Sequence, residues 1–469
     1  MQDAIILGGG ISGLTAGYLL QQKGLDVSII EARSHPGGPI TTYRENGYLH
    51  ENGPNSLLLT DPWVETFITE LGLDDQLLHS DPNAAKRFIV RNGRPIPAPA
   101  SPFQAVTTPL FSLKAKLGFL SEPFRKKLAP PESDTESVAS FVKRRMGPEF
   151  LDYAIDPFVS GIYAGDPKEL ILKHAFPLMY GFEQDGGSIL KGALRYKKKR
   201  KAEGTSYKKE SITFRDGLEI LPQTIARKLG NRLWLNSSVV AINRNDKGWQ
   251  VTWKQSDGVP RSEATTLKRA QASLTNFEGF AKHLIVCLPS HAIKKIAWQT
   301  DIAEQLQATP DLPYPAVHSL ALGYKKEQIK HLLDGFGMLI PSKEKRNILG
   351  ALFSSSLYNQ RAPDEHHLLT VMIGGRRRPE LAHKTENELI DLAQKDLADL
   401  IGLTGDPTFS HLTSWPQAIP QYTAAFTDWS KTLRGLEEDC PNLHFGGHSI
   451  DGIALGASIL SGKKLAESL

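Results

Sequence analysis

The chain has 469 residues, a formal net charge of +4 and two cysteines, Cys287 and Cys440. This mild positive excess does not indicate nucleic-acid binding, and two cysteines provide neither a disulfide framework nor zinc-ligand spacing. The sequence contains no run of about 18 apolar residues, so it predicts no membrane-spanning helix. A chain of this length is expected to form two or three lobes. Because the first predicted strand begins at Ala4, we expect a cytoplasmic protein with no cleavable targeting peptide.

Residues 4–32 predict a strand, a glycine-rich turn, a helix and a second strand that ends on an acid. Gly8 permits a sharp turn, Gly10 lets a pyrophosphate approach the backbone, and Gly13 lets helix and strand pack closely. The helix N-terminus offers unpaired N–H groups to phosphates, and Glu31 is placed to bind a ribose. The sequence therefore predicts a bound dinucleotide, and a tight turn that binds nothing is the alternative. The candidate cofactor residues here are Gly8, Gly9, Gly10, Ile11, Ser12, Gly13, Glu31 and Ala32.

Two further glycine-containing turns follow. Gly37-Gly38 and Gly53-Pro54-Asn55 flank a short predicted strand, and both suit backbone that lies against a flat or charged ligand. Two ordinary turns are the alternative. A helix is predicted for residues 61–71, started by the Asp61-Pro62 pair.

Residues 95–131 contain eight prolines that interrupt short apolar runs flanked by lysines. Such stripes can rest on an anionic membrane surface or form short helices that cover a cleft. A helix is predicted for residues 135–146 and a second apolar helical run for 150–158. We expect residues 161–167 to form a glycine-bracketed loop. The basic tract from Arg195 to Lys209 is expected to be a mobile loop, with contact to lipid headgroups as the alternative.

The remaining elements are mainly strands. Residues 217–228 predict a helix, 232–254 a hairpin closed at residues 245–248, and 282–289 a buried strand. An antiparallel sheet is predicted from residues 317–323, 336–340, 348–353 and 369–373. Thr385 opens a helix with a capping box. The segment 442–456 predicts a strand, a glycine loop and a helix N-terminus.

One complete dinucleotide fingerprint and no redox-active cysteine pair favour a flavin that the substrate reduces, with NAD as the alternative. The distant C-terminal glycine segment favours the longer FAD. The histidines at 366, 367, 444 and 448 are interpreted as structural, and we expect no metal site.

Several segments resemble the protoporphyrinogen oxidase family of amine-oxidase-like FAD flavoproteins over nearly the whole chain. The segments are residues 8–14, 31–38, 51–56, 86–88, 161–165, 216–218, 335–337, 415–422 and 452–454. Those around Gly161, Phe336 and Gln421 are the most specific. Two positions depart from the family pattern: His35 stands where an arginine is usual, with Arg33 nearby, and Pro39 replaces a larger residue.

The resemblance implies an α/β fold with a Rossmann-like FAD-binding domain of the para-hydroxybenzoate-hydroxylase type. It also implies an antiparallel-sheet substrate domain and a helical, membrane-facing lobe. The implied division is residues 1–84, 210–290 and 411–469 for the FAD-binding domain, 85–209 for the substrate entrance and lobe, and 291–410 for the substrate domain.

The resemblance also implies roles for individual residues. Arg87 would pair with a substrate propionate, Phe336 and Leu339 would enclose pyrrole rings, and Gly337 would leave space for them. The further implied substrate contacts are Gly161, Met372 and Asn55. The further implied contacts of a noncovalent FAD are Gly37, Gly38, Gly53, Pro54, Asn55, Val239, Trp415, Gly447, Gly452, Ile453 and Ala454.

The implied reaction is oxidation of protoporphyrinogen IX to protoporphyrin IX in three two-electron steps. A hydride passes to the flavin, oxygen is the acceptor, and no general base is named. The implied partners are the porphyrinogen, oxygen and a membrane surface, and a homodimer stays open. Coproporphyrinogen III oxidation is the nearest alternative, and an amine oxidase or a flavin-less prenyl-protein escort are more distant ones.

Overall fold

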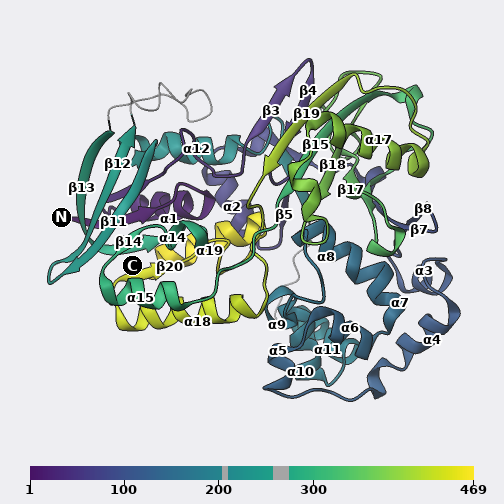
Figure 1. The fold of residues 1–469 in the computed structure, drawn as a ribbon, viewed down its shortest axis with the longest axis horizontal. Helices are drawn as coiled ribbons and strands as arrows, with labels where there is room; N and C mark the ends of the chain where they lie inside the picture. Colours follow the sequence, from purple (N-terminus) through teal and green to yellow (C-terminus); the bar gives the residue numbers. More distant parts are fainter. Residues whose placement is uncertain (203–209, 257–273) are drawn as a thin grey trace.

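The computed structural model describes residues 1–202, 210–256 and 274–469. Figure 1 shows an α/β fold with two large sheets side by side and a group of short helices below the second sheet. No helix in these residues combines the length and the apolar character needed to cross a bilayer.

In the described residues, the first large sheet has eight strands. Strand β1 pairs in parallel with β2 and β13, and β20 joins β13 in parallel, so the two ends of the chain meet its middle in one sheet. Ile5 and Ile6, adjacent in β1, are both fully buried, as expected for a parallel strand covered on both faces. The strands are β10 (Leu233–Trp234), β2 (Val27–Ile30), β1 (Gln2–Leu7), β13 (Leu274–Val286), β12 (Gly248–Ser256), β11 (Ser237–Asn245), β14 (Ala297–Trp298) and β20 (Leu443–Phe445).

This sheet confirms several predicted elements. The unit β1–α1–β2, with α1 at Ile11–Gln22, lies where the fingerprint predicts it. The hairpin closes between Asn245 and Gly248 as predicted. The strand predicted at 282–289 is longer and begins at Leu274, because its first half pairs with β12 and its second half with β1. Helix α19 (Leu455–Glu467) packs beside α1 (Figure 1).

The second large sheet has seven strands among the described residues. The predicted antiparallel sheet is confirmed, and β7 adds to it by parallel pairing with β16. Leu320 and Val371, on the face that α17 (Glu386–Ile401) covers, join one buried cluster with Leu389 and Leu397. The strands are β19 (Phe409–Trp415), β15 (Val317–Lys325), β18 (His366–Gly374), β17 (Ile348–Leu352), β16 (Gly335–Leu339), β7 (Lys86–Arg91) and β8 (Arg94–Pro97).

Smaller elements complete these two parts. The predicted helix after Asp61 is confirmed, and the Asp61 side chain accepts a hydrogen bond from the Trp63 N–H at 2.9 Å. The small strands are β3 (Thr42–Glu45), β4 (Tyr48–Glu51), β5 (Leu57–Leu59), β6 (Leu77–His79) and β9 (Glu210–Phe214). The further helices are α2 (Pro62–Glu70), α12 (Ile220–Leu229), α14 (Ser290–Ile293), α15 (Thr300–Ala308), α16 (Ser354–Leu357) and α18 (Ala424–Asp439).

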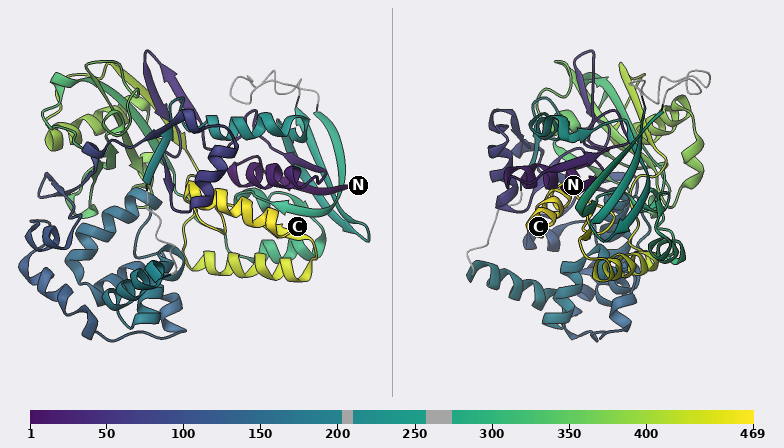
Figure 2. Two further views of the ribbon diagram at one scale, coloured as in Figure 1. Left: turned by 180° about the vertical axis from the view of Figure 1, so that it is seen from behind. Right: turned by 90° about the vertical axis from the view of Figure 1, so that its left-hand side faces the viewer.

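The short helices below the second sheet form what we call the helical lobe, residues 102–202 (Figures 1 and 2). The helix predicted at residues 135–146 is present as α6. The lobe contains α3 (Pro102–Thr107), α4 (Leu113–Leu120), α5 (Glu132–Thr135), α6 (Val138–Arg145), α7 (Pro148–Phe150), α8 (Asp156–Tyr163), α9 (Leu172–Ala175), α10 (Pro177–Gly186) and α11 (Ile189–Ala202).

Two predictions in the lobe are wrong. The expected loop at 161–167 begins inside a helix, because α8 continues to Tyr163 and ends at Ala164, whose φ is +48°. The basic tract up to Lys201 is helical rather than a mobile loop. Gly192 packs against the backbone of Phe182 in α10, and this tertiary contact supports a segment already rich in helix-forming Lys and Arg. Lys208 and Lys209 lie outside the described residues.

The five-segment domain division stays a prediction. Strands β7 and β8, which lie in the segment assigned to the entrance and lobe, pair in the second large sheet. Strand β14, from the segment assigned to the substrate domain, pairs in the first.

Candidate functional site

The glycine turn after β1 leaves open space at the start of α1. A Cβ added to Gly13 would lie 2.0 Å from the Gly8 carbonyl oxygen, so only glycine permits this close approach of helix and strand. A Cβ on Gly10 would meet nothing within 4 Å, and Gly10 caps α1 without a side-chain hydrogen bond. The N–H groups of Ile11 and Ser12 therefore have room for a phosphate in front of them.

Glu31 directly follows β2, beside this turn, and the next residue, Ala32, is exposed. One of its carboxylate oxygens accepts a hydrogen bond from the Gly9 N–H at 2.7 Å, and the other accepts one from the Arg33 N–H at 2.7 Å. Each oxygen keeps a lone pair for a further donor. The side chain is thus fixed in place and can still bind both hydroxyls of a ribose.

The Gly37-Gly38 turn approaches the first turn from the other side. The Gly37 N–H donates to the Gly9 carbonyl at 2.8 Å, and a Cβ on Gly38 would have the Gly10 Cα as its nearest atom, at 3.7 Å. A Cβ on Gly53 would lie 2.2 Å from the Pro39 carbonyl oxygen. The two predicted turns, including Pro54, are therefore packed on each other beside α1.

Arg33 supplies the cation on this side, where His35 departs from the family pattern. Its guanidinium donates to the Gly38 carbonyl at 2.7 Å and lies 5.8 Å from the ring centroid of Trp415. The Trp415 indole N–H donates in turn to the Asn52 carbonyl at 2.8 Å. Arg33 and Trp415 thus hold both turns in place.

The C-terminal glycine loop reaches the same place. A Cβ on Gly447 would lie 3.5 Å from the Ser12 hydroxyl oxygen, and that hydroxyl donates to the Ser458 carbonyl at 2.8 Å. Gly452, with φ of +134°, and Ile453 lead into Ala454, which caps α19 without a side-chain hydrogen bond. The N-termini of α1 and α19 therefore lie close together. Val239, in β11, is two residues from Ser237, whose N–H donates to the Glu31 carbonyl at 2.8 Å.

The predicted substrate residues lie on the second large sheet. In the parallel pairing of β7 with β16, Gly337 is opposite Arg87. The exposed Arg87 guanidinium lies 5.1 Å from the ring centroid of Phe336. Among the ion pairs found in residues 1–202, 210–256 and 274–469, none involves Arg87. This cation is therefore available to a carboxylate from outside the protein.

Leu339 and Met372 share one face of that sheet. Leu339 is opposite Gly350, and Gly350 is opposite Met372, so the row places both side chains on the same side with a glycine between them. In the next row, Leu352 lies between Gly337 and Thr370. This face is opposite to the one that α17 covers.

Helix α8 closes one end of this face. A Cβ on Gly161 would lie 2.5 Å from the Leu339 Cδ2 atom, so the helix backbone itself contacts the sheet face that holds the predicted substrate residues. The end of α8 is held by Gln421, whose side-chain amide donates to the Tyr163 carbonyl at 2.8 Å. The three segments that are most specific to the resemblance therefore meet in space.

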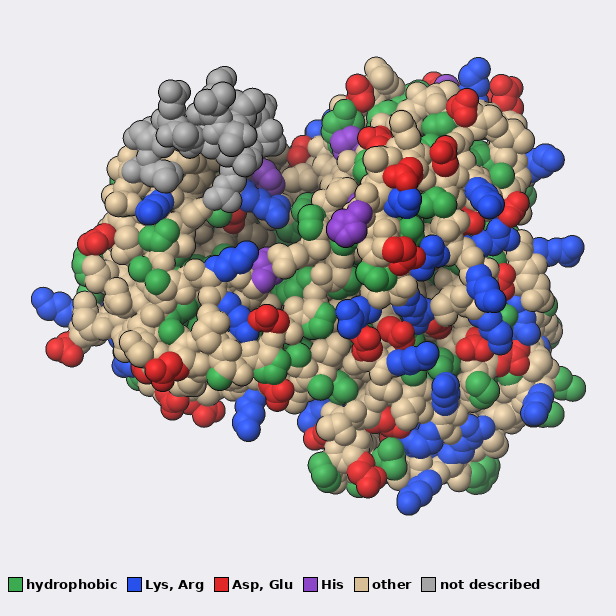
Figure 3. All heavy atoms as spheres, in the orientation of Figure 1, with side chains coloured by type: hydrophobic (Ala, Val, Ile, Leu, Met, Phe, Trp, Pro, Cys, Tyr) green, Lys and Arg blue, Asp and Glu red, His purple; other side chains and the backbone are tan. Residues whose placement is uncertain are grey.

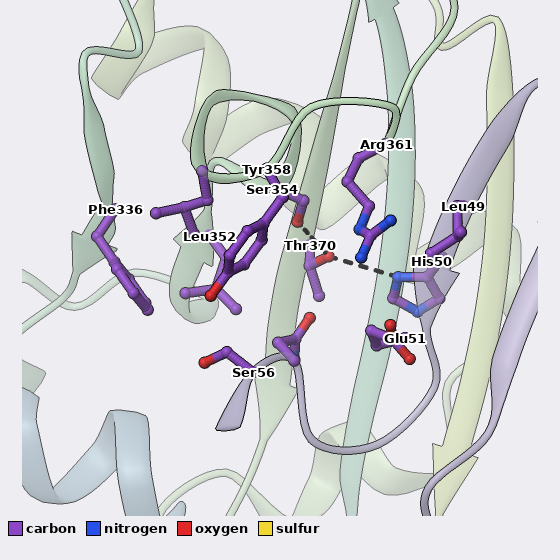
Figure 4. Close-up of a pocket in the computed structure, with 12 residues that line it drawn as sticks. Leu49, His50, Glu51, Ser56, Phe336, Leu352, Ser354, Tyr358, Arg361 and Thr370 are labelled. Carbon is purple, nitrogen blue, oxygen red and sulfur yellow. Dashed lines mark hydrogen bonds between the residues drawn. The ribbon is translucent and has the colours of Figure 1, made fainter. Parts of the chain in front are cut away.

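A small pocket lies beyond Phe336 and Leu352 (Figure 4). The figure shows Phe336 on one side, and His50, Glu51 and Arg361 on the other. The Ser354 and Thr370 hydroxyls are 2.8 Å apart, and the Thr370 hydroxyl lies 3.4 Å from His50 Nδ1. The other lining residues are Leu49, Asn55, Ser56, Leu357 and Tyr358.

Comparisons with known proteins agree with this geometry. The family model described as flavin containing amine oxidoreductase matches residues 11–469. Because that match covers almost the whole chain, it decides the family. The chain belongs to the flavin-containing amine oxidoreductases.

Individual members of the family match over similar lengths. Protoporphyrinogen oxidase 2, chloroplastic/mitochondrial, of Arabidopsis thaliana is 33% identical, over 98% of this chain and 92% of that protein. Coproporphyrinogen III oxidase of Bacillus subtilis (strain 168) is 25% identical, over 98% of this chain and 96% of that protein. A crystal structure from Exiguobacterium sp. 255-15 superposes with a TM-score of 0.77 at 20% identity, over 100% of this chain and 98% of that one.

As a flavin-containing amine oxidoreductase, the protein uses FAD. Its own residues fit that cofactor on two observations. The open space at Gly10 lies between two uncapped helix N-termini, which suits a pyrophosphate. Glu31 keeps lone pairs for a ribose.

The polar end of this flavoprotein's pocket was not predicted from the sequence. His50 and Arg361 are almost fully buried, and neither was a candidate. Burial lowers the pKa of His50 to about 3, so the imidazole is neutral. Burial also raises the pKa of Glu51 to about 7. Glu51 lies in the segment 51–56, which carries part of the family resemblance and could have identified it, whereas Arg361 lies in a loop that no motif marks.

Proposed function

We propose that this flavoenzyme oxidises protoporphyrinogen IX to protoporphyrin IX, with oxygen as the electron acceptor, in porphyrin and haem biosynthesis. The single observation that carries the proposal is the pair of Arg87 and Phe336. It presents an available cation against an aromatic ring at the edge of an apolar sheet face. This geometry occurs in a chain whose Arabidopsis relative is named a protoporphyrinogen oxidase.

Each residue has a physical task in this proposal. The Arg87 guanidinium pairs with a propionate of the substrate, for which its planar fork is suited. Phe336 and Leu339 contact the faces of pyrrole rings, and Gly337 and Gly350 leave room between larger side chains. Bound FAD supplies the two-electron acceptor. The protein holds a large apolar substrate in one orientation and keeps water from the reacting carbon.

The finer fold assignment belongs to the same proposal. We assign the first large sheet to an FAD-binding domain of the para-hydroxybenzoate-hydroxylase type, assembled from three chain segments. The parallel pairing of β1, β2, β13 and β20 supports this assignment. The second large sheet is then the substrate domain.

We also assign the helical lobe to peripheral contact with a membrane, at its cytoplasmic side. Large apolar side chains of the lobe face the solvent, and two of them, Phe103 and Phe124, are 77% and 89% exposed. Figure 3 shows hydrophobic and Lys or Arg side chains interspersed over the part of the surface where Figure 1 places the lobe. The other exposed apolar residues are Val106, Leu113, Leu117, Leu120, Phe158, Ile162, Leu178 and Leu194. A porphyrinogen dissolved in the bilayer would reach the substrate face of the second large sheet from the side of the lobe.

The experiment follows porphyrin fluorescence of the purified FAD-loaded protein with two substrates in parallel, protoporphyrinogen IX and coproporphyrinogen III. The proposal expects faster turnover of protoporphyrinogen IX and production of hydrogen peroxide. Equal rates, or faster turnover of coproporphyrinogen III, would contradict the choice of substrate. Amine oxidation without porphyrin formation would contradict the whole proposal.

Coproporphyrinogen III oxidation is the second candidate, since the Bacillus subtilis relative also matches the full chain. Coproporphyrinogen III carries four propionates, whereas protoporphyrinogen IX carries two propionates and two apolar vinyl groups. The sheet face offers Leu339, Leu352 and Met372 to the substrate, and these side chains suit vinyl groups better than carboxylates. The first candidate is therefore preferred.

A further inference from the structure

Positive charge is concentrated on helix α11. Between Gly187 and Ala202, seven side chains are Lys or Arg and none is Asp or Glu. Residues 102–131 add five Lys or Arg and a single acid, Glu122, which is buried and paired with Arg145. Because the whole chain has a net charge of only +4, the rest of the chain is net negative. The charge asymmetry singles out these two segments of the lobe.

Three of the lysines on α11 lie on one line. Residues at spacings of three and four positions share a face of a helix, and we call the row that they form the lysine stripe. The lysine stripe consists of Lys191, Leu194, Lys198 and Lys201. The other side of α11 packs on α10, where a Cβ on Gly192 would lie 2.2 Å from the Phe182 carbonyl oxygen. The lysine stripe therefore faces away from the protein, and Leu194 is 69% exposed.

The lysine stripe continues the apolar surface of the lobe. The Glu122 carboxylate accepts hydrogen bonds from the Ile189 and Leu190 N–H groups, at 2.9 Å and 3.3 Å, and so fixes the start of α11. Glu122 lies two residues after the end of α4 and opens a short 3₁₀ turn that ends at the exposed Phe124. Figure 2 (right) shows α11 projecting from the lobe at its edge. Exposed apolar side chains and lysines are thus neighbours where this turn contacts α11.

We propose that the lysine stripe binds the anionic headgroups of a lipid bilayer, so that attachment of the lobe depends on membrane charge. The inference rests on the membrane-facing role proposed for the lobe and adds the lipid class. Lysine side chains of an amphipathic helix lie at the headgroup level, where each gains from the negative surface potential. Leu194 and Phe124 enter the boundary with the acyl chains. A nucleic acid or an acidic protein would match the charge but not these exposed apolar groups.

The test measures sedimentation of the FAD-loaded protein with two kinds of vesicle, pure phosphatidylcholine and phosphatidylcholine mixed with phosphatidylglycerol. The protein should bind the anionic vesicles more tightly, and about 0.5 M salt should remove the difference by screening. The variant with Lys191, Lys198 and Lys201 all replaced by Gln should bind anionic vesicles at least about tenfold more weakly. Its binding to phosphatidylcholine should be unchanged.

A matched control replaces three exposed lysines on other parts of the surface, Lys254, Lys395 and Lys431, by Gln. This change lowers the net charge equally and should leave vesicle binding unchanged. Equal loss in the control, or no loss in the α11 variant, would overturn the inference. The inference would also be overturned if the α11 variant lost binding to the soluble polyanion heparin but kept its binding to anionic vesicles. That result would assign α11 to another polyanion. If the unaltered protein binds neither vesicle, the proposed membrane contact of the lobe fails as well, whereas the porphyrin assay tests the proposed reaction separately.

Discussion

Glu51 is a carboxyl group buried between the two large parts of the fold. One oxygen accepts a hydrogen bond from the Leu218 N–H at 2.9 Å and the other from the Thr42 hydroxyl at 2.8 Å. Burial is the largest effect and raises the pKa of Glu51 to about 7, while these hydrogen bonds and the nearby Arg361 partly offset it. The negative charge of Glu219 adds to the rise in the pKa.

This raised pKa predicts that stability falls with rising pH. The unfolded chain loses the Glu51 proton near the ordinary glutamate pKa of 4.5, whereas the folded protein keeps it until about 7. The folded state is therefore favoured most at low pH, and up to about 3 kcal/mol is lost as the pH rises from about 5 to about 8. Urea unfolding of the Glu51→Gln variant should show a smaller loss over this range. Glu304→Gln, at an exposed position, is the control, and equal slopes in all three proteins would contradict the prediction.

Arg87→Ala should weaken substrate binding more than it slows turnover. Removing a charge-assisted hydrogen bond to a carboxylate costs about 1.5–3 kcal/mol, so the KM for protoporphyrinogen should rise about tenfold or more with kcat within about twofold. Arg87→Lys keeps the charge but not the planar fork and should give an intermediate KM. Steady-state porphyrin fluorescence measures both constants. An unchanged KM in Arg87→Ala would remove the carboxylate role.

At the scale of elements, the helical lobe is held together by buried ion pairs. The Arg145 side chain is fully buried and contacts Glu122 at 3.2 Å and Glu183 at 2.9 Å. The neighbouring Arg144 pairs with Glu136 and Glu183. These residues connect α6, α10 and the start of α11. Because many apolar side chains of the lobe face outward, this network supplies part of the cohesion that a hydrophobic core provides elsewhere.

Arg145→Met should therefore destabilise the lobe strongly. It leaves the buried Glu122 carboxylate without the cation that it pairs with and leaves Glu183 with Arg144 alone, and breaking a buried ion pair costs about 3–5 kcal/mol in comparable cases. Hydrogen exchange should increase in residues 102–202 and stay unchanged in the two large sheets. Arg434→Met, which breaks a partly exposed pair with Glu437, should change exchange little. Adding Glu122→Gln and Glu183→Gln to Arg145→Met should recover part of the loss, and failure to do so would show that packing rather than charge is responsible.

The elements that the sequence predicted well have strong local signals. The unit β1–α1–β2 combines a glycine spacing with apolar strands, and α17 begins at a complete capping box formed by Thr385 and Glu388. The wrong predictions concern segments whose structure depends on distant contacts. Gly161 reads as a loop residue in isolation, but its lack of a Cβ lets α8 pack on Leu339. The helical state of α11 likewise depends on the contact of Gly192 with α10.

At the scale of the whole molecule, the site residues also divide into those marked by local sequence patterns and those that depend on distant contacts. The residues around α1 could be predicted, since glycine spacing and an acid at the end of a strand are local patterns. Phe336, Leu339 and Met372 became candidates only through the resemblance, because without it they read as sheet core. Arg361 was missed because its guanidinium donates to the Phe214 carbonyl at 2.8 Å, in a strand from another part of the chain. Such a contact leaves no pattern in the sequence around either residue.

FAD should stabilise the whole fold, because the residues that fit it come from the beginning, middle and end of the chain. At about a hundredfold excess over its dissociation constant, a ligand adds about 2.7 kcal/mol. Removal of FAD should therefore lower the Tm by roughly 3 °C. Differential scanning fluorimetry of the FAD-free and FAD-loaded protein measures this shift. An unchanged Tm on FAD removal would contradict the prediction.

Two glycine variants separate cofactor binding from folding. Gly10 has φ of −69° and open space around an added Cβ, so Gly10→Ala should leave the Tm of the FAD-free protein unchanged. The new methyl group would occupy space needed for the close approach of the pyrophosphate, so the stabilisation by added FAD should be largely lost. Gly13→Ala places its Cβ 2.0 Å from the Gly8 carbonyl oxygen and should lower the Tm of the FAD-free protein as well. Full stabilisation of Gly10→Ala by FAD would mean that the pyrophosphate does not lie at this turn.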